Sequence, residues 1–338
     1  MGTASAALPV VDVAPLVSGL GDVGAVADAI DEACRQHGFF YIVGHGVDEG
    51  LQDRLEEQAR ALFALPDEAK ERVAMRHGGA AWRGWFPLGG ELTSGVPDGK
   101  EGFYLGVELD PTDPRVRAGT PLHGPNLFPA ELPELRPVVL EYLAAMTQLG
   151  HALMRGIALA LGLPEAWFDD HLTADPLVLF RMFRYPPGAE AASRWGVAEH
   201  TDYGLLTMLR QDRTGGLEVH APSGWIEASP LPRSFVCNIG DMLERMTGGL
   251  YRSTPHRVRN TSADDRLSFP FFFDPGWDAE VLPVPLADPG GQADQRERWD
   301  GEDVLAFEGT YGDYLTRKVG RVFPDLQAEV IPGSPDTG

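Results

Sequence analysis

Cysteine, basic residues and long apolar runs are scarce in this sequence. Only two cysteines, Cys34 and Cys237, occur among 338 residues, so a disulfide framework beyond one bridge is excluded. No Lys or Arg precedes Arg35, so the basic region of a secretory signal peptide is missing. No stretch reaches the roughly 18 uncharged apolar residues of a membrane-spanning helix. Together these absences predict a reducing, cytoplasmic location.

Positive charge is outweighed by negative charge. The chain has 28 Lys and Arg residues against 50 Asp and Glu residues, which gives a formal net charge of −22. A surface this acidic repels phosphate backbones and anionic lipid headgroups, so it argues against a nucleic-acid partner and a membrane partner. A small-molecule partner is compatible with this charge, and the oligomeric state stays open.

Turn residues are abundant, which favours a β protein. Glycine (40) and proline (28) make up about a fifth of the chain, and this is high for a helical bundle. From Pro176 onward, short β-branched and aromatic runs alternate with turn residues, and this pattern predicts a β-sandwich or jelly roll. The expected strands are 177–185, 205–210, 216–220, 225–228, 235–239, 256–259 and 267–273.

The first half of the chain reads mainly as helices. Apolar residues recur at helical spacing in 22–37, 48–65 and 132–163, and short strands are expected at 8–13 and 38–44. The tract 132–163 is either one long helix or two helices with a break near Gly150. A closing helix is expected at 310–318. The predicted class is α+β, mainly β with flanking helices.

A metal site is the first chemical possibility that the residues raise. His200 and Asp202 are two positions apart, and on an extended segment such residues point to the same face. His256, 54 residues after Asp202 at the start of another expected strand, is a candidate third ligand. Two imidazoles and one carboxylate suit non-haem Fe(II) with open coordination positions. Taken alone, the same residues are also compatible with ordinary core or surface histidines.

A possible carboxylate receptor follows ten residues after His256. Arg266 and Ser268 share the i, i+2 spacing on an expected strand, so a guanidinium fork and a hydroxyl can lie side by side. The alternative is a surface arginine paired with Asp264 or Asp265.

Taken in order, these motifs resemble a known family. The chain is similar to the 2-oxoglutarate-dependent Fe(II) dioxygenases, in their isopenicillin N synthase-like branch. The resemblance covers most of the chain and is carried by four segments: GFFYIVGHG at 38–46, HTDYGLLTMLRQD at 200–212, NIGD at 238–241 and STPHRV at 253–258, followed by Arg266-x-Ser268.

The resemblance implies a role for each matching residue. His200, Asp202 and His256 would ligate Fe(II). Arg266 and Ser268 would hold the distal carboxylate of 2-oxoglutarate, and Tyr185 lies where the family has a tyrosine that also reaches that carboxylate. Plant members usually carry Asn two positions before this tyrosine; here the residue is Phe183, so the chain departs from the family there.

The resemblance also implies the fold and the reaction. The core would be a double-stranded β-helix, a jelly roll with N-terminal helices packed around it. One oxygenase domain would span 1–338, with a helix-rich region at 1–175, the Fe(II)/2-oxoglutarate-binding core at 176–285, and a C-terminal loop, helix and tail at 286–338. The enzyme would use O₂ and 2-oxoglutarate to oxidise a C–H bond of a small molecule by hydroxylation, desaturation or cyclisation, releasing succinate. Composition rich in Ala, Gly and Arg suggests bacterial secondary metabolism.

Substrate contacts are expected from the N-terminal region and from the core strands. Arg83 is a candidate for a substrate carboxylate, with a structural pairing to Glu91 or Glu101 as the alternative. The candidates for the walls of the pocket are Phe103, Tyr104, Tyr203 and Phe273.

Three other functions compete with this interpretation. An isopenicillin N synthase-like oxidase would keep the metal ligands and use O₂ without 2-oxoglutarate. A jelly-roll binding or storage protein would bind without turnover. A zinc hydrolase would use three ligands and a water, but it has no need of Arg266-x-Ser268.

Overall fold

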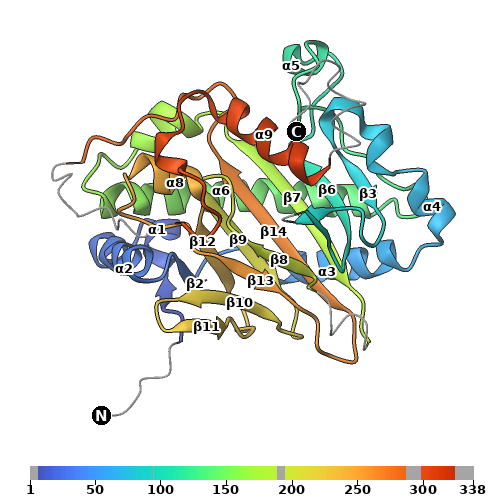
Figure 1. Cartoon of the computed structure of the whole chain (residues 1–338), viewed down its shortest axis with the longest axis horizontal. Helices are drawn as coiled ribbons and strands as arrows, with labels where there is room; N and C mark the ends of the chain where they lie inside the picture. The colour runs from blue at the N-terminus through green and yellow to red at the C-terminus, as the bar shows by residue number, and fades with distance from the viewer. Residues whose placement is uncertain (1–6, 94, 189–194, 287–297, 324–338) are drawn as a thin grey trace.

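A large mixed sheet lies at the centre of the molecule. The structure, a computed structural model, describes residues 7–93, 95–188, 195–286 and 298–323. The strands of the sheet are, in order across it, β1 (Val10–Asp12), β2 (Phe39–Val43), β12 (Phe235–Ile239), β9 (Leu206–Gln211), β14 (Arg266–Asp274), β7 (Leu177–Tyr185), β6 (Glu101–Gly106) and β3 (Gly84–Phe86) (Figure 1).

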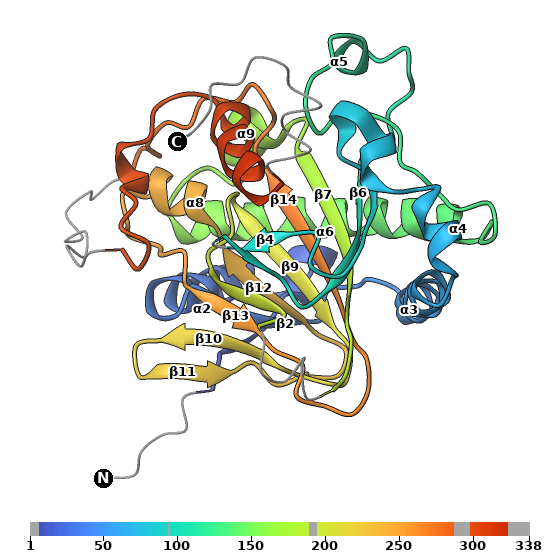
Figure 2. The ribbon, with the colours of Figure 1, turned by 45° about the vertical axis from the view of Figure 1, so that its right-hand side comes forward.

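A smaller antiparallel sheet completes the jelly roll. Its strands are β11 (Gly224–Glu227), β10 (Leu217–Ala221), β13 (His256–Val258) and β8 (Val197–His200) (Figure 2). A cavity is lined by residues of both sheets, so the two sheets enclose it between them. Strands β4 (Leu92–Thr93) and β5 (Val96–Pro97) form a separate two-stranded sheet, and β4 contacts β8. The predicted double-stranded β-helix is therefore confirmed.

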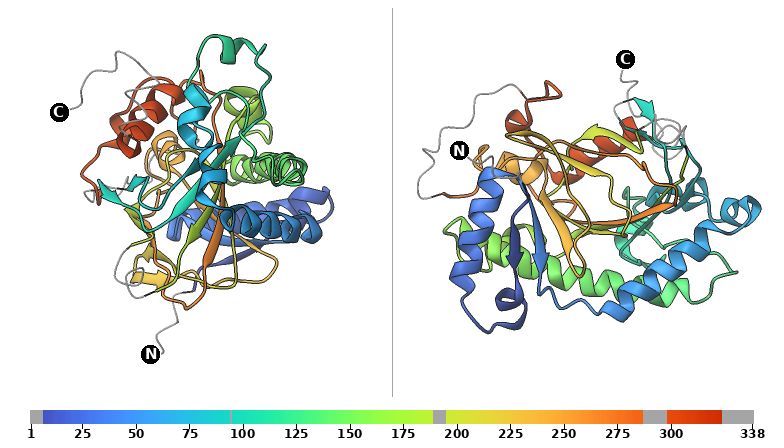
Figure 3. Two further views of the ribbon diagram at one scale, coloured as in Figure 1. Left: turned by 90° about the vertical axis from the view of Figure 1, so that its right-hand side faces the viewer. Right: turned by 90° about the horizontal axis from the view of Figure 1, so that it is seen from below.

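Three long helices cover the outer face of the larger sheet. They are α2 (Val23–Gln36), α3 (Glu49–Phe63) and α6 (Leu135–Ala160), and α6 contacts both of the others and β14 (Figure 3). Helix α6 is continuous, so no break occurs at Gly150. A Cβ at Gly150 would lie 2.3 Å from the ring of Phe273, so this glycine lets the helix approach the sheet closely.

Shorter helices close the ends of the molecule. They are α1 (Ala14–Ser18), α4 (Asp67–Glu71), α5 (Pro114–Arg117), α8 (Asp241–Met246) and α9 (Tyr311–Val322). Helix α9 begins with a reciprocal cap between Thr310 and Asp313, and three of its residues, Tyr311, Leu315 and Val322, line the cavity. Within the described ranges, none of the helices has the length and apolarity needed to cross a membrane.

The observed elements follow the sequence predictions closely in the second half. All seven strands expected there are present, with ends within one residue of those predicted. Strands β3, β4, β5, β6 and β8 were not expected. Of the C-terminal segment 286–338, the loop 287–297 and the tail 324–338 lie outside the described residues.

Candidate metal centre and active site

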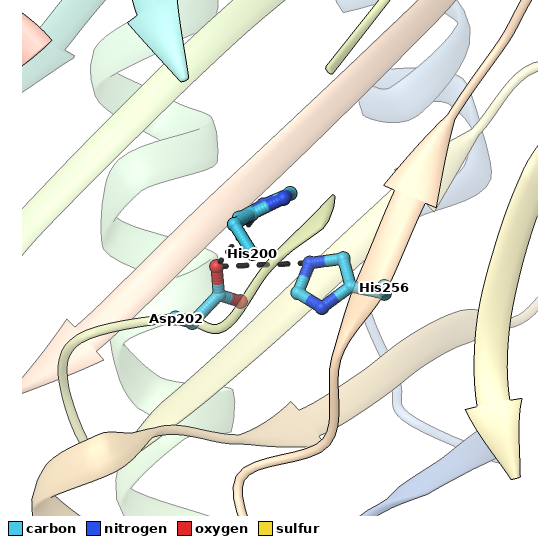
Figure 4. A group of neighbouring side chains, drawn as sticks. All are labelled: His200, Asp202 and His256. Carbon is cyan, nitrogen blue, oxygen red and sulfur yellow. Dashed lines mark ion pairs between the residues drawn. The ribbon is translucent and has the colours of Figure 1, made fainter. Parts of the chain in front are cut away.

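Three side chains converge where β8 meets β13. His200 ends β8, Asp202 follows it in the next loop, and His256 begins β13 directly opposite His200. Asp202 Oδ1 lies 3.9 Å from His200 Nε2 and 3.8 Å from His256 Nε2 (Figure 4). The three ligand atoms lie within 4.8 Å of one another, so they can share one ion.

Hydrogen bonds to the main chain fix which imidazole nitrogen is free. Nδ1 of His200 lies 2.8 Å from the carbonyl oxygen of Ala198, and Nδ1 of His256 lies 3.2 Å from that of Thr254. Because a carbonyl only accepts, each Nδ1 carries the proton and each Nε2 offers a lone pair. Burial lowers the pKa of both histidines, and the neighbouring His200 helps to lower that of His256 to about 4. Both rings are therefore neutral near pH 7.

Asp202 is oriented by two donors that the sequence analysis did not identify. Its Oδ2 accepts hydrogen bonds from the Thr207 hydroxyl, at 2.5 Å, and from the Asn238 amide, at 2.7 Å. Burial alone would raise the pKa of Asp202, but the two histidines and these hydrogen bonds hold it below its ordinary value. The carboxylate is thus ionised and presents Oδ1 to the histidines. Asn238 was detectable as the one polar residue in the buried strand β12.

Arg266 and Ser268 point into the same cavity. Arg266 lies opposite Tyr185 in the sheet, and its guanidinium carbon is 4.7 Å from the centre of the Tyr185 ring. Its Nε donates to the carbonyl of Gly215, and its Nη2 donates to Gln211 at 3.2 Å. Its Nη1 is buried and has no hydrogen-bond partner among the described residues.

The alternative surface role for Arg266 is wrong. Arg266 is fully buried, and Asp265 instead pairs with Arg184 at 2.9 Å. Ser268 and Tyr185 are also buried, with their hydroxyl oxygens 3.4 Å apart. One unsatisfied guanidinium N–H beside two hydroxyls is a ready site for a carboxylate.

One cavity of about 100 Å³ is lined both by the His200, Asp202 and His256 cluster and by Arg266, Ser268 and Tyr185. Two neutral imidazoles and an ionised carboxylate leave coordination positions open on a divalent ion, a donor set that fits Fe(II). The orphaned Nη1 of Arg266 fits the far carboxylate of an organic acid that reaches such an ion. The donors present therefore fit both groups that the resemblance implied.

The residues expected to bind substrate divide into two sets. Tyr203 lines the cavity. Phe103 and Phe273 are fully buried but lie outside it, because they oppose Met182 and Val178 on the other face of β7. Strand alternation places Phe272 in the cavity instead of Phe273.

Arg83 is not positioned to bind a substrate in this cavity. It lies outside the cavity lining, and its guanidinium donates to the carbonyls of Leu105, at 3.1 Å, and Leu122, at 2.8 Å. Neither Glu91 nor Glu101 is its partner, because those carboxylates bind other cations. Arg83 thus holds main-chain segments together.

A buried charged cluster in the cavity was missed from the sequence. Lys100 pairs with Glu91, at 2.8 Å, and with Asp98. Tyr104, which was expected to form a wall, donates a 2.5 Å hydrogen bond to Glu91. Arg181 also faces Glu91 and lines the cavity. The sequence signal was Arg181, a charged residue in the apolar strand β7. It lies four positions before Tyr185, so strand alternation places both side chains on the same face of the sheet.

A buried site of two histidines and one carboxylate inside a double-stranded β-helix defines a non-haem metal oxygenase. Residues 8–131 match a family model described as the N-terminal region of non-haem dioxygenases in morphine synthesis, and residues 175–275 match that of the 2OG-Fe(II) oxygenase superfamily. A Dictyostelium discoideum protein described as an iron/ascorbate oxidoreductase is 46% identical over 330 residues, covering 90% of this chain and 91% of its own. The chain belongs to the 2-oxoglutarate/Fe(II) oxygenase superfamily, and Fe(II) and 2-oxoglutarate are its cofactors.

Other relatives agree with this assignment. A homoarginine-6-hydroxylase from rice is 37% identical, with 94% of this chain and 98% of that protein covered. A 2OG-Fe(II) oxygenase family protein from Caulobacter crescentus superposes with a TM-score of 0.77 at 29% identity, covering 93% of this chain and 99% of its own. JOX2, crystallised with 2OG, Fe and JA, gives a TM-score of 0.72 at 27% identity, covering 93% and 85%. These relatives do not favour the oxidase that works without 2-oxoglutarate.

Proposed function

We propose that this enzyme oxidises a C–H bond of a small organic molecule, by hydroxylation, desaturation or cyclisation, while 2-oxoglutarate is converted to succinate and CO₂. The observation that carries the proposal is that one cavity is lined by both the two-histidine, one-carboxylate cluster and the guanidinium of Arg266, whose Nη1 has no acceptor among the described residues.

The metal ligands are His200, Asp202 and His256. Fe(II) and 2-oxoglutarate bound there supply the activation of O₂. The chain itself presents two Nε2 lone pairs and Asp202 Oδ1, and it holds the second carboxylate oxygen with Thr207 and Asn238. This support keeps the donor atoms in place before the metal arrives.

The residues that hold 2-oxoglutarate are Arg266, Ser268 and Tyr185. Arg266 supplies the orphaned Nη1 and is kept in place by Gly215 and Gln211. The Ser268 and Tyr185 hydroxyls stand beside it as further donors. Phe183 faces the same cavity but contributes an apolar surface, so it makes no polar contact of the kind that Asn makes in plant members.

The substrate is a small molecule that the apolar and charged walls of the cavity hold near the metal. The names of relatives support this: they include homoarginine-6-hydroxylase and 1-aminocyclopropane-1-carboxylate oxidase.

Residues 1–338 act as one catalytic unit. The pairing of β2, from the N-terminal region, with β12, from the core, supports this. Two buried free thiols support a reducing cytoplasmic compartment, and a role in bacterial secondary metabolism is our further expectation.

The proposal is tested by anaerobic reconstitution with Fe(II), followed by addition of 2-oxoglutarate. We expect a weak visible charge-transfer band, and succinate release once O₂ and substrate are admitted. Bound iron without a band would leave the oxidase as the better interpretation, with Arg266 and Ser268 assigned to the substrate.

Two variants separate the metal from the co-substrate. Asp202→Ala removes the charge that offsets the ion, so we expect loss of iron binding. In Arg266→Ala we expect iron binding to be kept and the affinity for 2-oxoglutarate to fall by roughly 10- to 100-fold, since charge-assisted hydrogen bonds are worth about 1.5–3 kcal/mol. An active, iron-loaded Asp202→Ala enzyme or an unchanged 2-oxoglutarate requirement in Arg266→Ala would refute the corresponding role.

A further inference from the structure

The geometry points to Arg181 as the group that binds the carboxylate of the oxidised substrate, a small organic monocarboxylic acid. This inference rests on the proposed oxygenase function and names the substrate class of the same cavity. Arg181 lies on β7 and lines the cavity that contains the metal ligands. It takes the role that the sequence suggested for Arg83.

Aromatic packing holds the guanidinium of Arg181 in place. Its central carbon lies 4.1 Å from the centre of the Tyr104 ring and 4.8 Å from that of Phe272. Tyr104 is its neighbour across the sheet on β6, and Phe272 belongs to β14. Ring contacts of this kind orient a guanidinium but do not satisfy its in-plane N–H groups. The fork is therefore fixed before a ligand binds.

At least one donor of the Arg181 guanidinium lacks an acceptor within the part of the chain that the structure describes. Its Nε is buried, and no acceptor among the described residues reaches it. Glu91 Oε1 faces Nη1 at 3.6 Å, which is beyond hydrogen-bond distance. Glu91 is already engaged by the Tyr104 hydroxyl and by Lys100. A buried cation with unsatisfied donors is costly, and a carboxylate that presents two oxygens to the fork removes that cost.

Arg181 and Arg266 serve different carboxylates. Arg181 and Tyr185 both point into the cavity from β7, and four residues of strand separate them by about 13 Å. Arg266 lies directly opposite Tyr185. A carboxylate held by Arg266 is therefore out of reach of Arg181, and the second guanidinium is left for another ligand.

The surroundings of Arg181 restrict the rest of that ligand. Burial alone would raise the pKa of Glu91, but Lys100 and Arg181 lower it below its ordinary value, so Glu91 is ionised. This negative charge disfavours a second acid group on the substrate. Leu179 and Leu315 contribute apolar walls to the cavity. The substrate is thus a monocarboxylate with a compact apolar body.

The test uses the anaerobic Fe(II)·2-oxoglutarate enzyme and a panel of acids, each paired with its primary amide. The probes are hexanoate, benzoate, phenylacetate and 1-aminocyclopropane-1-carboxylate, and binding is measured by calorimetry. We expect wild type to bind at least one acid tenfold or more tightly than its amide. Arg181→Lys and Arg181→Gln should weaken that acid by roughly 10- to 100-fold and leave the amide unchanged.

A matched control is available on the same strand. Arg184→Lys alters an arginine three residues away that pairs with Glu101 and Asp265 outside the cavity, so its acid affinity should match wild type. Thermal unfolding of each variant checks folding. The visible 2-oxoglutarate band should be unchanged in both Arg181 variants, because Arg266 is untouched.

Three results would overturn the inference. The first is a wild-type enzyme that shows no preference for acids over amides across the panel. The second is equal acid affinity in wild type and Arg181→Gln. The third is an Arg181→Gln enzyme that binds acids normally but 2-oxoglutarate weakly, which would assign Arg181 to the co-substrate. Absence of the visible band in wild type would instead contradict the proposed function itself.

Discussion

Asp274 carries a proton at a pH where other aspartates have lost theirs, and this should be visible in the stability of the protein. It ends β14, where its Oδ1 accepts a 3.2 Å hydrogen bond from the amide of Leu205 and its Oδ2 lies 2.6 Å from the Tyr311 hydroxyl. Burial raises its pKa from 3.8 to about 7, although both hydrogen bonds act in the opposite direction. Asp274→Asn keeps an acceptor for Leu205 and a partner for Tyr311, and it cannot ionise.

The sign of the effect follows from proton binding. In the unfolded chain the carboxyl ionises near pH 3.8, whereas in the folded protein it keeps its proton until about pH 7. The unfolded state binds fewer protons across this window, so the free energy of unfolding falls as the pH rises from about 4 to about 7 and then levels off. A shift of about 3 pKa units corresponds to about 4 kcal/mol, of which about 2.5 kcal/mol is lost between pH 5 and pH 8.

Urea unfolding of the metal-free protein at pH 5, 6, 7 and 8 measures this effect. The free energy of unfolding of Asp274→Asn minus that of wild type should increase by about 2.5 kcal/mol from pH 5 to pH 8. Asp28→Asn, which removes an exposed carboxyl on α2, serves as the control and should follow wild type. A difference between Asp274→Asn and wild type that stays constant with pH would refute the reasoning.

Two further changes test the support of the metal ligands. Asn238→Leu removes the amide that holds Asp202 Oδ2, so Fe(II) affinity measured by chelator competition should fall by roughly 10- to 100-fold; an unchanged affinity would show that Thr207 alone suffices. Gly204→Ala would place a Cβ 1.5 Å from Asp274 Oδ1 and should cost about 1–3 kcal/mol in urea unfolding, whereas equal stability would mean that the loop shifts freely.

The strands of the jelly roll were predictable because their signals are local. In β7 and β14 the apolar runs are long, and turn residues bound them on both sides. Strand β8 was missed because two of its four residues, Glu199 and His200, are polar, and so short a segment then has too few of the β-branched and aromatic residues that indicate a strand. Strand β6 was missed for a similar reason: it begins with Glu101, directly after Lys100, and both charged side chains are buried because they form ion pairs with other segments.

The candidate site was predictable where its residues share a strand or a short motif. His200 with Asp202 and Arg266 with Ser268 are such pairs, and the same alternation would have excluded Phe273. The choice between Arg83 and Arg181 could not be made in this way. It depends on which guanidinium receives carbonyl acceptors from distant segments, and those contacts exist only in the folded chain.

The pairing of β2 with β12 sets the order in which this chain can fold during synthesis. Strand β2 carries the run Phe39–Val43, and its partner, Phe235–Ile239, is made roughly 190 residues later. At about 5–20 residues per second, that interval is about 10–40 s. Throughout it, an aromatic and β-branched segment has an unpaired edge, a sequence type that is prone to aggregate. We therefore expect the nascent chain to need chaperone protection until β12 emerges, long after its N-terminal helices can form.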